Sequence, residues 1–214
     1  MKTKYYFDAL PSNYEVVKVI DAKSAKVNII FLIANVLLIT IILAIGIPLL
    51  YKINNISFAD VVKSANYIIL GCFVASMFIY IVLHELTHGL FYKIFTHEKL
   101  KYGFTLTVAF CGVPDLYVKK IASLVTTLAP FVVYNIVFIL MIVLIPNPSI
   151  KFLSLVMFAI HFGGCVGDLW VASYLLLKNR GKSILVNDTG PKQTFFVEKE
   201  EIDDTLSWFH KFIN

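Results

Sequence analysis

Four long apolar stretches limit what this chain can fold into more than any other feature of its sequence. They cover residues 27–50, 65–95, 121–145 and 152–177. A helix that crosses a bilayer needs about 20 mainly apolar residues, and each stretch is long enough. The composition agrees, because 58% of the 214 residues are hydrophobic, 15% are charged, and the mean hydropathy is +0.78. We therefore predict an all-α polytopic membrane protein with four transmembrane helices.

Basic residues fall mainly on one side of these predicted helices, which sets the expected topology, because loops rich in lysine and arginine stay in the cytoplasm. Twelve lie before the first helix, between the second and third, or in the five residues after the fourth: Lys2, Lys4, Lys18, Lys23, Lys26, Lys99, Lys101, Lys119, Lys120, Lys178, Arg180 and Lys182. The opposite loops hold only Lys52, Lys63 and Lys151. We expect both termini in the cytoplasm, with residues 1–26 as an N-terminal segment, 27–177 as the membrane domain and 178–214 as a tail.

The composition also indicates partners and location. The net charge is +5, but the lysines are dispersed between apolar stretches, so anionic lipid is the expected partner and nucleic acid is not. The three cysteines are odd in number and far apart, which makes a disulfide framework unexpected. The first 26 residues lack the features of a cleavable signal peptide. Abundant lysine, asparagine and isoleucine point to a bacterium, and hence to a multi-pass protein of its cell membrane.

Two soluble segments carry further patterns. Alternating apolar residues from Phe104 to Phe110 predict a short β-strand, which either pairs with an extended substrate or only with its own hairpin partner. In the tail, residues 188–190 predict a hairpin turn. Residues 202–213 then predict an amphipathic helix, which either lies on the membrane surface or packs against the protein's own cytoplasmic face. Between the third and fourth helices, residues 145–148 read Ile-Pro-Asn-Pro and predict a tight turn.

The motif His84-Glu85-Leu86-Thr87-His88 lies within the second apolar stretch. On a helix, this spacing places two imidazoles one turn apart, where both can bind one Zn²⁺, and leaves the glutamate to activate water. Ionisable groups inside a bilayer are costly and normally serve a function. The sequence therefore predicts His84 and His88 as zinc ligands and Glu85 as the catalytic base.

Catalytic zinc usually takes a third protein ligand, and the fourth helix offers Asp168 and His161. His84 lies seventeen residues past Tyr67 and Asp168 sixteen past Phe152, which corresponds to depths of about 26 and 24 Å in straight helices. Asp168 is therefore the predicted third ligand. Glycines at 163 and 167 are expected to let the fourth helix approach the metal helix closely.

His161 lies about 10 Å further from the cytoplasm than Asp168. It is expected either to hydrogen-bond within the bundle or to contact the substrate or its oxyanion.

The residues His84 to Phe91 on a membrane helix, with a lone Asp168 on a later helix, resemble the site-2 protease type of intramembrane metalloprotease. The chain is more similar to the putative zincin peptidase family of small bacterial membrane proteins. That resemblance runs from Leu10-Pro11-Ser12-Asn13-Tyr14 through the zinc motif and Leu128-Ala129-Pro130 to Gly167-Asp168 and Asp188-Thr189-Gly190. It implies a zincin-like peptidase and supplies no substrate.

The chain departs from site-2 proteases proper at two places. Their metal-binding aspartate commonly precedes a glycine and follows an Asn-x-x-Pro element. Here Asp168 precedes Leu169, and the polar residue upstream of it is His161. Asn135, which follows Pro130 in the third helix, either supplies the missing amide to the substrate or hydrogen-bonds within the bundle.

These patterns predict an intramembrane zinc metalloprotease that hydrolyses membrane-embedded or membrane-adjacent peptides near the cytoplasmic face. The alternative is a non-catalytic protein, such as an immunity or scaffold factor, in which zinc only braces two helices. The sequence leaves the oligomeric state open.

Overall fold

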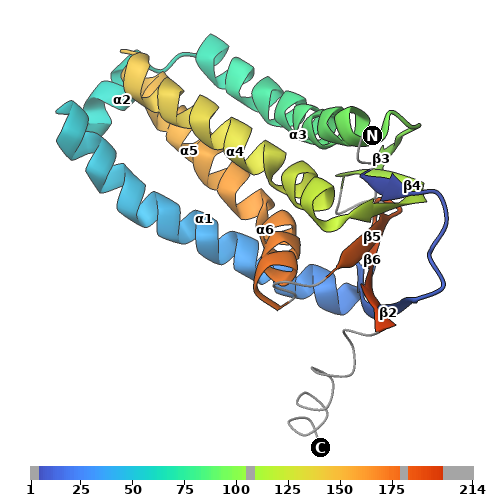
Figure 1. Cartoon of the computed structure of the whole chain (residues 1–214). Coiled ribbons are helices and arrows are strands. Elements are labelled where there is room, and N and C mark those ends of the chain that lie inside the picture. Colours follow the sequence, from blue (N-terminus) through green and yellow to red (C-terminus); the bar gives the residue numbers. More distant parts are fainter. Residues whose placement is uncertain (1–4, 105–108, 179–182, 200–214) are drawn as a thin grey trace, which may run out of the picture. The chain divides into compact units, whose positions relative to one another are not determined.

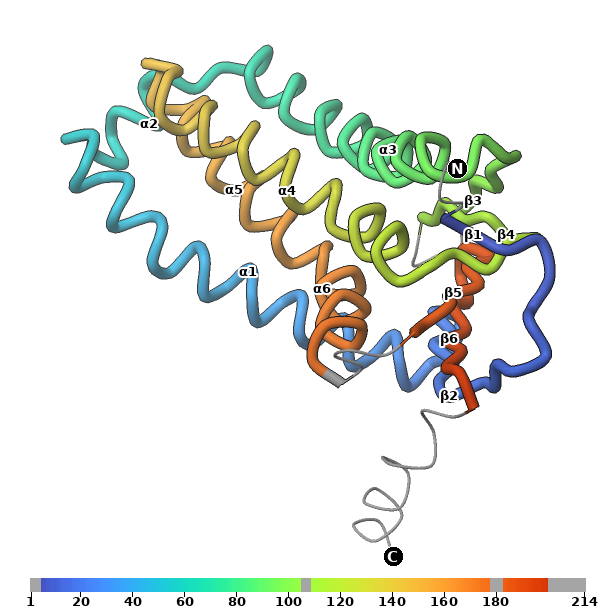
Figure 2. The backbone as a smooth tube through the Cα atoms, in the orientation of Figure 1, coloured from blue at the N-terminus to red at the C-terminus, as the bar shows by residue number. Residues whose placement is uncertain are grey.

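The computed structural model describes residues 5–104, 109–178 and 183–199 (Figure 1). The elements are β1 (Tyr6–Phe7), β2 (Tyr14–Asp21), α1 (Ala25–Asn54), α2 (Phe58–Ser64), α3 (Tyr67–Thr96), β3 (Lys101–Phe104), β4 (Ala109–Lys119), α4 (Lys120–Leu144), α5 (Pro148–Gly164), α6 (Val166–Ser173), the π-helix η1 (Tyr174–Lys178), β5 (Ile184–Asp188) and β6 (Lys192–Glu198). The amphipathic helix predicted for residues 202–213 lies outside the described residues. Figure 2 traces the backbone through these elements.

Among the described residues, three helices, α1, α3 and α4, are long and apolar enough to cross a membrane. They correspond to the first three predicted spans. Many of their large apolar side chains are exposed, which is compatible with a lipid environment. The fourth predicted span is not one straight helix, because α5 and residues Val166–Leu177 pass the same test only as a pair bent by 45°. The bend follows a pair of glycines that weaken the end of α5.

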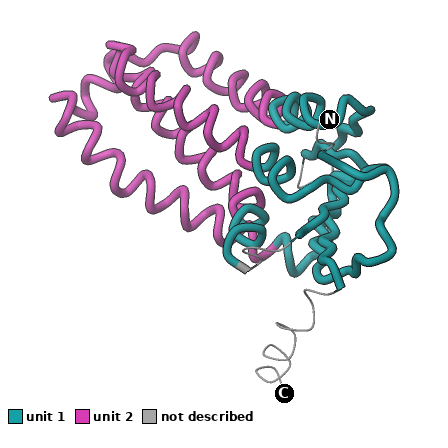
Figure 3. The backbone as a smooth tube through the Cα atoms, in the orientation of Figure 1, with its two compact units in different colours: residues 1–28, 85–127, 170–214 teal, residues 29–84, 128–169 magenta. Residues whose placement is uncertain are grey.

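The chain divides into two compact units, which are coloured separately in Figure 3. The helical unit comprises residues 29–84 and 128–169, and the sheet unit comprises residues 1–28, 85–127 and 170–214. The division falls inside α1, α3, α4 and α6, and it separates His84 from Glu85 within the predicted zinc motif.

Small and polar residues fasten the helices of the helical unit together. Ser149 at the start of α5 donates to the backbone oxygen of Val61 in α2 over 2.6 Å. Lys151 of α5 is buried, and its Nζ donates to Oδ1 of Asn54 and to the backbone oxygens of Ile142 and Val143 at the end of α4. The predicted turn between α4 and α5 is present: Asn147 is the N-cap of α5, and its side chain accepts from the backbone N–H of Ile150.

The glycines at 163 and 167 do not face the metal helix. A side chain at Gly163 would collide with Asn35 and Ile39 of α1, and one at Gly167 would meet Phe31 of the same helix. The prediction that these glycines bring Asp168 close to α3 is therefore wrong. They let α5 and α6 approach α1 instead. The sequence could not predict this, because a pair of small residues indicates a close helix contact but not which helix is the partner.

The sheet unit contains a six-stranded antiparallel sheet in the order β1-β4-β5-β6-β2, with β3 also paired to β4. This sheet is larger than the short strand and the tail hairpin that the sequence predicted. The predicted hairpin at residues 188–190 is confirmed, since β5 pairs with β6. The strand predicted from Phe104 to Phe110 is instead divided between β3, which ends at Phe104, and β4, which starts at Ala109. Residues 105–108 between them lie outside the described residues.

Two apolar clusters form the core of this unit. One joins the end of α3 and the start of α4 to β4: Tyr92, Cys111, Val113, Leu116, Val118 and Ala122. The other packs α6 and η1 against β5 and β6: Val171, Leu175, Ile184, Val186, Phe195 and Val197. The sheet therefore holds the second half of the motif-bearing helix α3 by direct packing.

Candidate metal centre

Helix α3 carries the whole predicted motif within one continuous helix. Because an α-helix turns once in 3.6 residues, His84 and His88 project from the same face and are separated by about 6 Å along the axis. Glu85 leaves the helix about 100° further round. The helix thus provides the local spacing that a two-histidine site requires.

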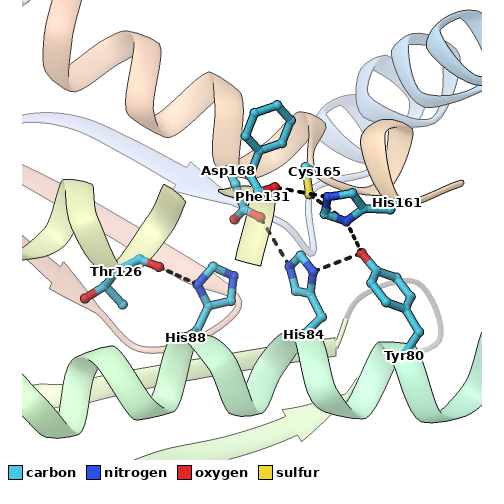
Figure 4. Close-up of polar contacts among 8 residues, drawn as sticks. All are labelled: Tyr80, His84, His88, Thr126, Phe131, His161, Cys165 and Asp168. Atoms are coloured by element: carbon cyan, nitrogen blue, oxygen red, sulfur yellow. Dashed lines mark hydrogen bonds and ion pairs between the residues drawn. The ribbon is translucent and has the colours of Figure 1, made fainter. Parts of the chain in front are cut away.

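In the helical unit, His84 is in contact with Asp168. Nε2 of His84 lies 3.3 Å from Oδ2 of Asp168, and their side chains are 12% and 21% exposed (Figure 4). Asp168 occupies the first turn of α6, where the partial positive charge of a helix N-terminus favours a carboxylate. The contact joins two of the predicted zinc ligands from separate helices.

In the sheet unit, a backbone carbonyl orients His88. Nδ1 of His88 lies 2.9 Å from the backbone oxygen of Thr126 (Figure 4). A carbonyl oxygen only accepts, so Nδ1 carries the proton and donates it, and a neutral His88 keeps the lone pair on Nε2. The Thr126 oxygen is open to this bond because Pro130, four residues later in α4, has no N–H to offer it.

His161 lies closer to the site than its expected depth suggests. It is fully buried, and its Nδ1 is 2.6 Å from Oη of Tyr80, which in turn is 3.1 Å from Nδ1 of His84 (Figure 4). The expected depth difference of about 10 Å between His161 and Asp168 assumed a straight helix. The 45° bend between α5 and α6 removes that assumption, and both residues lie beside the His84 ring.

A second group of side chains in the helical unit also has ligand-like spacing. The ligand atoms of His84, His161 and Cys165 all lie within 4.8 Å of one another. However, both ring nitrogens of His161 are already engaged, Nδ1 by Tyr80 and Nε2 by the backbone oxygen of Phe131 at 3.3 Å. His161 therefore offers no free lone pair to a metal, and this group is the weaker candidate.

The catalytic-base candidate Glu85 shares a helix face with Gly89, one turn later. The phenol oxygen of Tyr102, in β3, packs directly on Gly89, where any larger residue would collide with the ring. Burial raises the pKa of Tyr102 to about 12, with smaller contributions from Cys111 and from the Glu85 carboxylate. Tyr102 therefore stays protonated at neutral pH and remains a hydrogen-bond donor beside this face of α3.

Asn135 lies on α4 in the helical unit. Its Oδ1 is buried and has no hydrogen-bond partner among the residues that the structure describes. The structure thus leaves its predicted role toward a substrate as a prediction.

Comparison with known proteins finds a matching family model. This model, described as "Putative zincin peptidase", matches residues 77–182, a range that contains His84, Glu85, His88 and Asp168. The match agrees with the resemblance that the sequence indicated. No curated protein and no solved structure matches the chain.

The matching zincin family implies zinc, and the residues of this chain fit that ion. Zinc prefers imidazole nitrogen and carboxylate oxygen. Metal-binding histidines commonly donate their second ring N–H to a carbonyl or another acceptor, as His88 does to Thr126. The described His, Cys and Asp side chains thus include groups able to hold the ion that the family implies.

Sequence reasoning missed three contributors to this candidate metal site: Tyr80, Thr126 and Tyr102. Two of them carried a signal. Tyr80 precedes His84 by four residues and so shares its helix face, and Thr126 precedes Pro130 by four residues and so has a carbonyl without its helical donor. Tyr102 carried none, because its contact with Gly89 depends on how β3 folds back on α3.

Proposed function

We propose that this protein is an intramembrane zinc metalloprotease that hydrolyses peptide bonds of membrane-embedded or membrane-adjacent substrates near the cytoplasmic face. The observation that carries the proposal is the contact between Nε2 of His84 and the Asp168 carboxylate. Glu85 directly follows His84, and all three residues lie in the range that the zincin family model matches. In this proposal His84, His88 and Asp168 hold the ion, and Glu85 is left for catalysis.

The chain's own residues have distinct tasks in this reaction. A bound zinc ion would supply Lewis acidity, which lowers the pKa of water and polarises a carbonyl. Glu85 accepts the proton of the attacking water and later delivers it to the leaving amine. Tyr80 holds the ring of His84 and Thr126 holds the ring of His88, in each case through a hydrogen bond at Nδ1 of the histidine. No covalent intermediate with the protein is required.

An apolar cavity supports the proposal of a membrane-embedded substrate. The helical unit contains a cavity of about 440 Å³ between α3, α4 and α5, a size within the usual range for ligand sites. Its lining is almost wholly apolar and reaches Tyr80, one turn before His84, and Leu83, which directly precedes it. Apolar side chains of a membrane segment fit this chemistry better than a hydrophilic peptide does.

An open strand edge supports presentation of an extended peptide. Among the described strands, β3 pairs only with β4, so its other edge is available for a further strand. Proteases commonly hold their substrates extended, and strand addition supplies main-chain hydrogen bonds. Pairing of a substrate with β3 is therefore part of the proposal.

The test of catalysis compares wild type with Glu85→Gln in cells, by sequencing the new N-termini that appear in membrane proteins. Glu85→Gln should keep zinc and lose the new N-termini, because an amide accepts no proton. Glu15→Gln is the matched control, since Glu15 pairs with Lys199 on the surface of the sheet unit. Cleavage by Glu85→Gln at the wild-type level would overturn the mechanism.

The test of the ligand set measures zinc in purified protein with and without Asp168→Ala. The proposal predicts a loss of bound zinc, and an unchanged stoichiometry would remove Asp168 from the ligands. The alternative function, a non-catalytic protein braced by zinc, predicts that Glu85→Gln keeps the cellular phenotype. A phenotype lost at normal protein level would exclude that alternative.

A further inference from the structure

A chain of four hydrogen-bonding groups runs through the helical unit to His84. It begins at the backbone oxygen of Phe131 and continues through the ring of His161 and the hydroxyl of Tyr80 to Nδ1 of His84 (Figure 4). The successive distances are 3.3, 2.6 and 3.1 Å. These groups come from α4, α5 and α3, so the chain ties three helices to one imidazole ring.

The acceptor at the start of this chain fixes the direction of every bond in it. The Phe131 carbonyl only accepts, so Nε2 of His161 carries a proton and donates. A neutral His161 then has its lone pair on Nδ1 and accepts the proton of the Tyr80 hydroxyl. Because the Tyr80 hydroxyl donates its hydrogen to His161, its oxygen can only accept a hydrogen bond from His84. Nδ1 of His84 is therefore the protonated nitrogen, and its Nε2 carries the lone pair.

The lone pair on His84 Nε2 faces a carboxylate. Oδ2 of Asp168 lies 3.3 Å away, so a cation placed there is attracted by the carboxylate and by the lone pair of Nε2 together. The hydrogen-bond chain thus prepares His84 to bind a cation together with Asp168, before any ion arrives. His88 reaches the same tautomer by another route, through the Thr126 carbonyl.

We propose that Tyr80 and His161 are positioning residues, which fix His84 in the tautomer that binds metal through Nε2. The proposal rests on the proposed function, because it treats His84 as a zinc ligand. It also gives His161 a role other than contact with the substrate: its burial and its two engaged nitrogens hold it within the bundle. Partners of this kind typically change metal affinity by about 10- to 100-fold.

The first measurement is the tautomer of His84 in metal-free protein, read from long-range ¹H–¹⁵N spectra of protein labelled only at histidine. The protein has five histidines in all, so the spectrum can be assigned by single substitutions. In wild type, Nδ1 of His84 should be protonated and Nε2 should not. In Tyr80→Phe, which removes one oxygen and keeps the ring, this preference should be lost. The same tautomer in both proteins would overturn the proposal.

The second measurement is zinc affinity, by competition with a chelator. Tyr80→Phe and His161→Leu should bind zinc about 10- to 100-fold more weakly than wild type. His161→Asn should restore most of the affinity, because its amide oxygen can accept from Tyr80. Tyr67→Phe is the matched control: it removes a hydroxyl from the same helix at a residue that is 84% exposed, and it should change nothing.

The two measurements separate this proposal from the proposed function. If wild type binds no zinc, the proposed function fails, while the tautomer of His84 still tests the hydrogen-bond chain. If wild type binds zinc and Tyr80→Phe binds it equally well, the positioning role fails alone. Should His161→Leu not fold, Tyr80→Phe and His161→Asn still decide the question.

Discussion

Replacing Gly89 with alanine tests how the sheet unit is packed on the motif-bearing helix. A Cβ at this position would overlap the phenol oxygen of Tyr102 and lie 2.7 Å from its Cζ, far inside van der Waals contact. Tyr102 is 45% exposed on an edge strand, so its ring can move outward, but only by giving up its contact with α3.

The expected magnitude comes from two opposing effects. Alanine in place of glycine favours a helix by up to about 1 kcal/mol. Forcing extra volume into a packed contact costs about 1 to 3 kcal/mol. We expect the free energy of unfolding to fall by about 1 to 2 kcal/mol, which lowers Tm by about 2 to 8 °C for a chain of this size.

The assay is thermal unfolding in detergent, with a control on the same helix. At Gly71 of α3, a Cβ would meet nothing within 4 Å, so Gly71→Ala should be neutral or stabilising. In a Tyr102→Leu background, Gly89→Ala should also be harmless, because the colliding ring is gone. If Gly89→Ala and Gly71→Ala unfold at the same temperature, the packing of Tyr102 on α3 is refuted.

Three contacts elsewhere in the chain can be tested by single substitutions. Burial raises the pKa of Asp188 to about 6, and the Tyr92 hydroxyl donates a hydrogen bond of 2.7 Å to its carboxylate. Because the pKa is higher in the folded state than in the unfolded state, the stability that this carboxyl group contributes is complete below about pH 4 and is lost as pH rises through 6. Tyr92→Phe should therefore cost about 1 to 3 kcal/mol at pH 8 and less at pH 5, and an equal loss of Tm at both pH values would contradict this. Lys151→Met leaves three acceptors unpaired and should cost about 1 to 3 kcal/mol in thermal unfolding, whereas the exposed Lys52→Met should not. Pro130→Ala supplies an N–H that competes with His88 for the Thr126 oxygen, so zinc affinity measured against a chelator should fall by about tenfold, and an unchanged affinity would show that Pro130 has no part in orienting His88.

The position and length of the apolar stretches were enough to predict the long helices. Helices α1, α3 and α4 begin and end within a few residues of the predicted apolar stretches, because a membrane helix needs only length and hydrophobicity. The turn at Asn147-Pro148 was also predictable, because these residues cap and start a helix locally.

The sheet and the bend could not be predicted because they depend on distant residues. Strand β2 pairs with β6, and the register places Tyr14 opposite Glu198, 184 residues later in the chain. Residues 14–21 contain four β-branched residues, which favours a strand but does not identify the partner strand. His161 and Asp168 both lie beside His84, on either side of the bend between α5 and α6, and a depth estimate that assumes straight helices cannot anticipate this.

X-ray absorption spectroscopy of zinc bound to the purified protein would identify the ligand atoms directly. A site formed by His84, His88 and Asp168 predicts nitrogen and oxygen neighbours at about 2.0 to 2.2 Å and no sulfur. The competing group of His84, His161 and Cys165 would instead give a zinc–sulfur distance of about 2.3 Å. A sulfur neighbour that disappears in Cys165→Ser would contradict the proposed ligand set.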